Sequence, residues 1–334
     1  MASSVHLATT GSLKELVDQG ARSVPSKYVF PSRVAVDKSP SRTLKPLASP
    51  PAIDLAPLDT SERHVAVSQI GSACRDYGFF QVTNHGVSPS LLGRLLAAAD
   101  KFYSLPVEER LPYLVDDPRD KRSACVNWKE TTAFRSDSSA PTFCMEPALE
   151  YKAEAQKLGE KLYRAIVESL GATVDEETSK QHVASCNMLM HYYPPCPDPT
   201  LTFGLSEHTD AGFITVLLQD QVGGLEILKD GHWIACDPVP NSLTINIADQ
   251  MEILSNGRYA SILHRVVPNG DKPRLSVPCF IGPSMDATIS PLAHLIDESN
   301  AALYKEVVYH DYLQHYMTVR FDDTATNGLD FARL

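Results

Sequence analysis

His208 and Asp210 stand one residue apart within residues 205–276, where short apolar runs alternate with Gly and Pro turns. Runs of this kind predict β-strands, and alternate residues on a strand face the same side. The two side chains can therefore point together into a cavity, where His264 from a later apolar run could add a third ligand. Two imidazoles and one carboxylate with open coordination positions are the ligand set typical of non-haem Fe(II).

The His-x-Asp tripeptide is weak evidence when it is taken alone. With 11 histidines in 334 residues, such a tripeptide arises about once by chance, and a surface histidine beside a polar turn explains it equally well. His264 carries more weight because it lies in the apolar run 261–267, where a buried imidazole needs a hydrogen bond or a metal. A core histidine satisfied by one hydrogen bond remains the alternative there.

Arg274 and Ser276 repeat the two-residue spacing and can face one pocket from a strand. The pair suits a carboxylate, since Arg offers a planar fork of donors and Ser adds one more. The alternative for Arg274 is a solvated charge at a strand edge. We expect His264 and Arg274 on neighbouring antiparallel strands. A two-residue turn at Asn269-Gly270 would then put them on opposite faces, so that a shared pocket requires a longer loop or a bulge.

Two groups of elements must position these residues, namely a part with helices and a few strands before residue 188 and a series of short strands after it. A capping box at Ser12 predicts a short first helix, and the Pro-rich residues 24–51 are expected to run extended over the surface. Hydrophobic periodicity then predicts strands at 52–55 and 78–82, helices at 65–76, 89–102 and 148–171, strands at 188–193, 213–219, 225–228, 233–235, 243–247, 262–267 and 275–281, and a last helix at 300–316. The series of short strands after residue 188 is typical of a β-sandwich or barrel.

Composition limits the class of partner. The formal net charge of −11 leaves no basic surface for nucleic acid and would be repelled by an anionic membrane, so we expect a small-molecule partner and a monomer. No apolar run approaches a membrane span, and the N-terminus lacks the apolar core of a secretory signal. Seven scattered cysteines without a Cys-x-x-Cys pair predict a reducing compartment, namely the cytoplasm, with the nucleus as an alternative.

Several motifs occur in a fixed order along the chain. They are Gly78-Phe79-Phe80-Gln81-Val82, Tyr192-Tyr193-Pro194-Pro195-Cys196-Pro197, His208-Thr209-Asp210, Gly223-Gly224-Leu225, Ser255-Asn256-Gly257-Arg258-Tyr259, His264-Arg265 and Arg274-x-Ser276. In this order and spacing they resemble the plant 2-oxoglutarate- and Fe(II)-dependent dioxygenases over nearly all of residues 51–316. Within that family the chain most resembles the branch of salicylate hydroxylases and flavonoid-oxidising enzymes.

The resemblance implies a mainly β fold with α-helices, in which a double-stranded β-helix, or jelly roll, forms the core and helices flank it. Residues 1–50 would be the short helix and Pro-rich segment, residues 51–170 an α/β region, and residues 171–334 the Fe(II)- and 2-oxoglutarate-binding domain with its C-terminal helix. The three parts would form one catalytic unit.

The resemblance also implies the chemistry, which is hydroxylation of a small aromatic plant metabolite such as a phenolic acid or flavonoid. 2-Oxoglutarate and O₂ would be consumed, succinate and CO₂ released, and ascorbate would act as a supporting reductant. Fe(II) would bind His208, Asp210 and His264, and 2-oxoglutarate would bind Arg274, Ser276 and Tyr193. Phe280 would face the substrate ring, with a core phenylalanine as the alternative.

Two departures from the family pattern bear on the substrate. His191 replaces the Asn that most relatives carry, and could contact the cosubstrate, place a nitrogen near the iron, or face away. Residues 122–147 look shorter than in relatives, where this segment helps to wall the substrate pocket. These departures keep open a catalytically impaired binding or regulatory protein. An ascorbate-driven oxidase that does not use 2-oxoglutarate and a zinc hydrolase stay open as well, because both would use the same three ligands.

Overall fold

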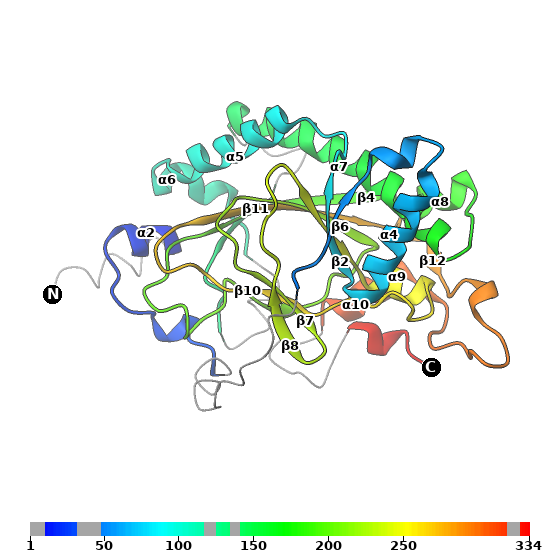
Figure 1. Ribbon diagram of the computed structural model, residues 1–334. Coiled ribbons are helices and arrows are strands. Elements are labelled where there is room, and N and C mark those ends of the chain that lie inside the picture. The colour runs from blue at the N-terminus through cyan, green and yellow to red at the C-terminus, as the bar shows by residue number, and fades with distance from the viewer. Residues whose placement is uncertain (1–10, 32–47, 117–124, 134–140, 319–327) are drawn as a thin grey trace.

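Two facing β-sheets form the centre of the protein, and helices cover the outer face of the larger sheet. The computed structural model describes residues 11–31, 48–116, 125–133, 141–318 and 328–334. The larger sheet has the strand order β1-β2-β9-β6-β11-β4-β3, and the smaller has the order β5-β10-β7-β8. Figure 1 shows α5 and α7 above the larger sheet, with β10, β7 and β8 below it. This arrangement confirms the predicted jelly roll.

Most strands lie within a few residues of their predicted positions. Their bounds are β1 Ala52–Asp54, β2 Phe79–Thr83, β3 Glu130–Ala133, β4 Ser185–Tyr193, β5 Leu205–His208, β6 Ile214–Gln219, β7 Leu225–Lys229, β8 His232–Ala235, β9 Leu243–Ile247, β10 His264–Val266, β11 Arg274–Gly282, β12 Thr288–Ile289 and β13 Val307–Val308. The predicted strand ranges did not include β3, β5, β12 and β13, which have only two to four residues and therefore show little alternation.

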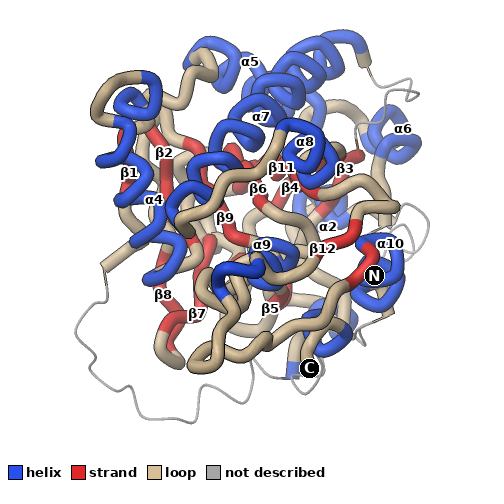
Figure 2. The backbone as a smooth tube through the Cα atoms, turned by 90° about the vertical axis from the view of Figure 1, so that its right-hand side faces the viewer, coloured by secondary structure: helices blue, strands red, loops and turns tan. Residues whose placement is uncertain are grey.

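Helices α4, α5 and α7 pack their buried apolar residues onto the larger sheet, and Figure 2 shows α7 above β6, β11 and β4. Their bounds are α2 Leu13–Asp18, α4 Arg63–Asp76, α5 Pro89–Tyr103, α6 Val107–Arg110, α7 Thr142–Ser169, α8 Glu176–His182, α9 Asp249–Leu254 and α10 Tyr309–Tyr316. α7 begins before the predicted residue 148 and carries Pro147 inside it. On its inner stripe Leu158, Leu162 and Ile166 are buried, as periodicity predicts.

The helix predicted at 300–316 is wrong over its first half. Only Tyr309–Tyr316 is helical, and Val307–Val308 pairs with β12 instead. The side chain of Asn256 accepts a hydrogen bond from the Leu303 amide at 2.8 Å and donates one to the Ala301 carbonyl at 3.0 Å. These tertiary hydrogen bonds and the strand pairing override the helical propensity of the segment.

The described part of the Pro-rich segment does not run over the surface as predicted. Val24, Tyr28 and Phe30 are buried, and the ring of Tyr28 meets that of Trp128 edge-on at 5.1 Å. Burial of aromatic side chains is a large favourable contribution, which offsets the extended, proline-fixed backbone. Residues 32–47 lie outside the described residues.

The expected pairing of the strands that carry His264 and Arg274 is also wrong. β10 lies between β5 and β7 in the smaller sheet, whereas β11 lies between β4 and β6 in the larger one. Residues 267–273 therefore cross from one sheet to the other instead of closing a hairpin. The two side chains face one cavity from opposite sides, so that no bulge in a shared hairpin is needed.

Gly224 fixes the start of this crossing. Its φ is +97°, and a Cβ at this position would lie 2.4 Å from the carbonyl oxygen of Val267. The Val267 amide donates to the Gly224 carbonyl at 2.8 Å. Only glycine combines this backbone conformation with so close an approach.

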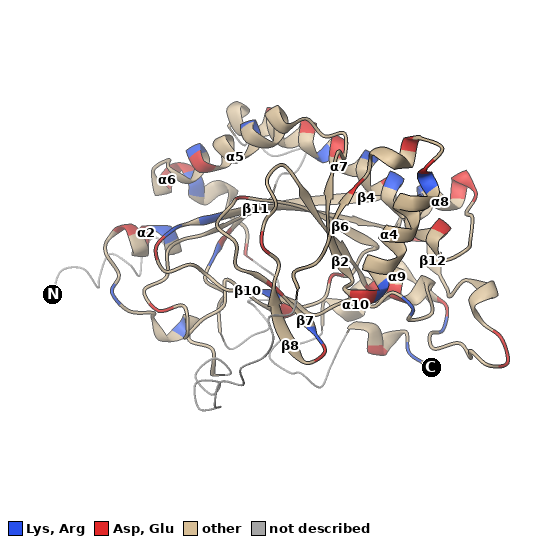
Figure 3. Ribbon diagram, viewed as in Figure 1, with Lys and Arg blue, Asp and Glu red and all other residues tan. Residues whose placement is uncertain are grey.

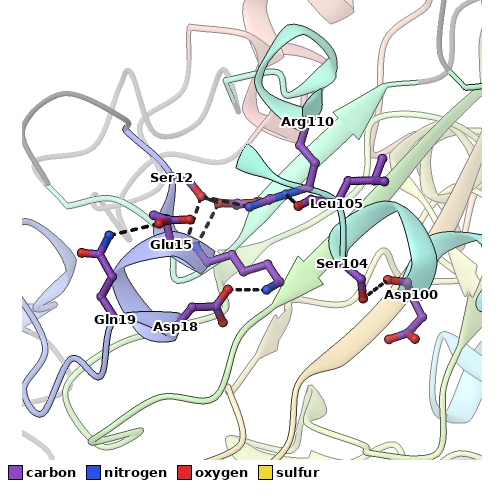
Figure 4. Close-up of polar contacts among 10 residues, drawn as sticks. Ser12, Glu15, Asp18, Gln19, Asp100, Ser104, Leu105 and Arg110 are labelled. Atoms are coloured by element: carbon purple, nitrogen blue, oxygen red, sulfur yellow. Dashed lines mark hydrogen bonds and ion pairs between the residues drawn. The ribbon is translucent and has the colours of Figure 1, made fainter. Parts of the chain in front are cut away.

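Glu130 of β3 attaches the N-terminal helix α2 to the edge of the larger sheet by hydrogen bonds and forms a buried ion pair with Arg110 of α6. Arg110 Nη1 donates to Glu130 Oε2 at 2.5 Å, and both side chains are at most 5% exposed. The other carboxylate oxygen of Glu130 accepts from the Ser12 hydroxyl and from the Lys14 amide at the start of α2. Figure 4 shows Arg110 reaching toward Ser12. The helix N-terminus, where backbone N–H groups lack partners, thus meets a carboxylate from β3.

Charged residues gather on the outside of this structure. Figure 3 shows acidic and basic residues interspersed along α6, α7 and α8, and fewer charged residues on the strands of the two sheets. Among the helices of the described residues, none is long and apolar enough to cross a membrane.

We predict that Arg110→Met lowers the free energy of unfolding by about 3–5 kcal/mol, because it leaves the Glu130 carboxylate buried without its cation. Arg94→Met is the matched control, since Arg94 pairs with Glu150 on the surface, where both side chains are nearly half exposed. Its cost should stay below about 1 kcal/mol. Urea denaturation followed by circular dichroism measures both, and equal costs would contradict the account.

Candidate metal centre and anion pocket

The two histidines predicted to share a site are direct cross-strand neighbours. His264 on β10 pairs with His208 at the end of β5, and a register shift follows, since Val266 pairs with Leu205. Asp210 lies two residues beyond His208, and the side-chain alternation continues past the strand end. His208, Asp210 and His264 are buried, and one ligand atom from each lies within 4.8 Å of the others. The structure thus brings together all three residues that the sequence predicted.

Hydrogen bonds fix which ring nitrogens carry protons. Nδ1 of His208 lies 2.7 Å from the Ser206 carbonyl oxygen, and Nδ1 of His264 lies 3.1 Å from the Ile262 carbonyl oxygen. A carbonyl can only accept, so each Nδ1 is the protonated nitrogen and each Nε2 presents a lone pair. These two Nε2 atoms lie 3.8 and 3.9 Å from Oδ1 of Asp210. Three acceptor atoms converging in this way fit a divalent cation such as Fe(II).

The second oxygen of Asp210 is held by the larger sheet. Thr215 Oγ1 donates to Asp210 Oδ2 at 2.6 Å, and Asn246 Nδ2 donates to the same oxygen at 2.7 Å. These bonds turn Oδ1 toward the histidines. Sequence reasoning missed both donors, although each is a polar residue on the cavity face of a strand whose opposite face is apolar, which was the available signal.

Two residues beside the metal-ligand cluster tie it to α9 and α10. The backbone amide of Asp249 donates to the Asp210 carbonyl at 2.9 Å. The side-chain carboxyl of Asp249 is fully buried, and this burial raises its pKa to about 7. Tyr316 donates its hydroxyl to the Thr209 carbonyl at 2.6 Å, which holds the residue between the two ligands. No sequence pattern points to this tyrosine, because its contact depends on where the C-terminal helix docks.

Arg274 is a buried cation on the far side of the cavity. It is 1% exposed, and its guanidinium donates to Gln219 Oε1 at 2.9 Å and to Ser276 Oγ at 3.2 Å. Among the described residues, its Nε has no hydrogen-bond partner and no carboxylate pairs with the guanidinium. The Tyr193 ring lies 5.0 Å from the guanidinium carbon. A buried guanidinium with unused donors fits a carboxylate ligand, as the Arg-x-Ser spacing predicted.

One cavity joins the metal-ligand cluster to Arg274. Most of its lining is apolar, with a few polar side chains that converge at its two ends. His191 and Phe280, the two predicted substrate residues, also line it. The segment 122–147 lies partly outside the described residues, and its described part supplies β3 beside this cavity.

Two family models match the chain. Residues 184–283 match the 2OG-Fe(II) oxygenase superfamily, and residues 50–163 match the non-haem dioxygenase in morphine synthesis N-terminal family. The first match spans the cluster and Arg274, and the second spans β1 to most of α7.

Curated relatives and solved structures agree with these matches. Flavanone 3-dioxygenase 2 of Oryza sativa subsp. japonica is 36% identical over 90% of this chain and 92% of its own length. Scopoletin 8-hydroxylase of Arabidopsis thaliana is 34% identical over 96% and 94%. The crystal structure of JOX2 in complex with 2OG, Fe and JA superposes with a TM-score of 0.80 at 30% identity, covering 96% of this chain and 97% of that one.

We predict that Thr215→Val and Asn246→Ala each weaken divalent metal binding about 10- to 100-fold, because Asp210 loses a donor that orients it. Titration with Mn(II) followed by calorimetry measures the affinity. Thr202→Val is the control, since the Thr202 hydroxyl is buried but bonds only the Phe203 carbonyl among the described residues. Unchanged affinity in both site variants would show that the Asp210 orientation does not depend on these donors.

Proposed function

Because this chain belongs to the 2OG-Fe(II) oxygenase superfamily, we propose that it hydroxylates a small aromatic plant metabolite, such as a phenolic acid or a flavonoid. The family membership makes it an enzyme that uses Fe(II), 2-oxoglutarate and O₂ on small molecules. The observation that carries the proposal is the single cavity that joins a cluster of three metal-ligating acceptors to a buried guanidinium and an apolar wall.

In this proposal His208, Asp210 and His264 hold Fe(II) through Nε2, Oδ1 and Nε2. The backbone carbonyls bonded to Nδ1 orient the two imidazoles so that the Nε2 lone pairs point at the metal. Thr215 and Asn246 hold the Asp210 carboxylate in place. When bound, the metal, 2-oxoglutarate and O₂ together supply the oxidising equivalents, and 2-oxoglutarate leaves as succinate and CO₂. The protein contributes positioning and a dry environment.

Arg274 and Ser276 bind the carboxylate of 2-oxoglutarate that lies farther from the metal. Gln219 accepts from one guanidinium nitrogen and so orients the planar donor fork, and the Tyr193 ring packs beside it. Burial keeps water away from the cation, which strengthens its attraction for a carboxylate.

Support for an aromatic substrate comes from the apolar wall and from the relatives. Phe280 is half-buried on β11 and lines the cavity together with Phe79, Leu217 and Pro278. A planar ring packs well against such a surface. Two relatives carry names that specify aromatic substrates, flavanone and scopoletin, while JOX2 was crystallised with JA.

An ascorbate-driven oxidase and a zinc hydrolase are less favoured by the same geometry. Either would use the three metal ligands but would leave Arg274 buried without a carboxylate, which is costly. The division into residues 1–50, 51–170 and 171–334, the monomeric state and the cytoplasmic location stay predictions from the sequence.

The proposed activity is tested by succinate release from purified protein with Fe(II), ascorbate, 2-oxoglutarate and a panel of phenolic acids and flavonoids. We expect turnover that requires Fe(II) and rises with at least one aromatic compound, whose product has gained one oxygen atom. Absence of 2-oxoglutarate turnover across the panel, in protein that binds metal, would overturn the proposal.

We predict that Arg274→Ala raises the KM for 2-oxoglutarate at least tenfold, because it removes charged donors to a carboxylate. Arg265→Ala is the matched control, since Arg265 lies on β10 and pairs with Glu207 and Glu226 instead of facing the cavity. Its KM should stay within about twofold of wild type. An Arg274 variant with unchanged 2-oxoglutarate dependence would favour the ascorbate-driven oxidase.

A further inference from the structure

Gln219 stands behind two residues that line the cavity. It lies at the end of β6, which runs between β9 and β11 in the larger sheet (Figure 1). Gln219 is the cross-strand partner of Ser276, so its side chain is on the face that carries Arg274 two residues away. Among the described residues, Arg274 and Thr244 belong to the cavity lining and Gln219 does not. Gln219 therefore acts on a ligand through its neighbours.

The orientation of the Gln219 side-chain amide follows from what each partner can do. A guanidinium can only donate, so Oε1 of Gln219 is the atom that faces Arg274, which donates from Nη2 at 2.9 Å. The amide nitrogen faces the other way and donates to Oγ1 of Thr244 at 3.2 Å. Because both ends of the amide are bonded, it cannot turn over without losing both bonds. The direction of Nη2 is thereby fixed.

The partners of Arg274 fix its guanidinium without neutralising it. Nη1 donates to the Ser276 hydroxyl at 3.2 Å, so the two described acceptors of the guanidinium are a hydroxyl and an amide. Asp220 follows Gln219 directly, but its carboxylate is committed to backbone amides, with Oδ2 accepting from Leu275 at 2.6 Å and Oδ1 from Val222 at 3.0 Å. The positive charge of Arg274 is therefore left for a ligand.

We propose that Gln219 is a positioning residue that makes the Arg274 end of the cavity select 2-oxo dicarboxylic acids over 2-oxo monocarboxylic acids. A neutral oxygen holds the guanidinium in place, and a ligand that brings a second carboxylate supplies the missing negative charge. The inference rests on the proposed placement of the distal 2-oxoglutarate carboxylate at Arg274. It is independent of which compound the enzyme oxidises.

The charge part of the inference is tested with Gln219→Glu, which keeps the shape of the side chain. The introduced carboxylate stays ionised beside a guanidinium and competes with the carboxylate of the ligand. The probes are 2-oxoglutarate and 2-oxopentanoate, which has a methyl group in place of the distal carboxylate. We expect the affinity for 2-oxoglutarate to fall at least about tenfold and that for 2-oxopentanoate to be unchanged. Calorimetric titration of Mn(II)-loaded protein, without O₂, measures both.

The orientation part is tested with Gln219→Met, which introduces no buried charge and so serves even where Gln219→Glu fails to fold. The guanidinium then loses one of its two fixed acceptors and can reach a carboxylate at more than one distance from the metal. We expect the discrimination between 2-oxoglutarate and 2-oxoadipate, which is one methylene longer, to fall about fivefold. The preference for either diacid over 2-oxopentanoate should remain.

Gln81→Glu is the matched control. Gln81 is buried on β2 of the same sheet, and two strands separate β2 from β11. Its Oε1 accepts from the Val239 amide at 2.8 Å and from the Ser242 hydroxyl at 3.0 Å, and a carboxylate can accept the same bonds. We expect this variant to keep the wild-type preference for 2-oxoglutarate over 2-oxopentanoate.

Metal affinity separates a positioning role from a merely structural one. Gln219 makes no described hydrogen bond to the metal-ligand cluster, so Mn(II) affinity should be the same in wild type and in Gln219→Met. Weaker Mn(II) binding in Gln219→Met would show a general structural role and overturn the inference.

Arg274→Ala distinguishes failure of this inference from failure of the proposed function. Unchanged 2-oxoglutarate affinity in Arg274→Ala would show that the cosubstrate is placed wrongly, and both would fall. If Arg274→Ala weakens 2-oxoglutarate but Gln219→Glu keeps the wild-type preference over 2-oxopentanoate, the role of Gln219 alone is wrong.

Discussion

Two imidazole nitrogens and one carboxylate oxygen converge in a buried cavity, where a neutral imidazole with Nδ1 bonded to a carbonyl presents only a lone pair to the carboxylate. Such a set is unfavourable without a cation, and the rest of the structure holds it in place. The histidines are fixed by cross-strand pairing in the smaller sheet and by backbone carbonyls behind their rings. Asp210 is fixed by Thr215 and Asn246 from the larger sheet. The metal centre is therefore one of the places where the two sheets are joined, beside the apolar cluster in which Phe79 and Tyr193 pack against Val266.

At the other end of the cavity the uncompensated charge is positive, and it calls for an anion instead of a cation. Arg274 is a cation that is 1% exposed, and its described partners Ser276 and Gln219 are neutral. A dianionic cosubstrate that reaches both ends of the cavity binds the metal ion with one end and the Arg274 guanidinium with the other. Neither end alone would specify 2-oxoglutarate, since metal clusters and buried arginines each occur in many proteins. Their shared cavity makes the assignment specific.

Sequence reasoning identified the groups whose spacing is local and missed those whose role depends on long-range pairing. His208 with Asp210, and Arg274 with Ser276, are two residues apart, and strand alternation is enough to place each pair on one face. The partner of each strand is a different matter, because a local hairpin pattern cannot reveal that residues 267–273 cross between sheets. The role of Thr215 and Asn246 could have been predicted, because each is a polar residue on a strand whose opposite face is apolar. Tyr316 was not, since its contact requires α10 to dock behind Thr209.

The substrate side of the cavity is hardest to read because it depends on a four-residue edge strand. On one face of β3, Glu130 binds the N-terminal helix and Arg110, and Thr132 meets Tyr103 in the core. On the other face, the Thr131 hydroxyl lies 3.0 Å from Nδ1 of His191. A short strand shows little periodicity, and an edge strand has a partner on only one side to fix its register. Here that edge is paired by Leu114, which forms a bridge with Thr132, and by Val115, whose amide donates to the Thr131 carbonyl at 2.8 Å. The N-terminal helix adds its hydrogen bonds to the Glu130 side chain. Residues remote in sequence from the metal ligands therefore hold the strand beside one wall of the cavity.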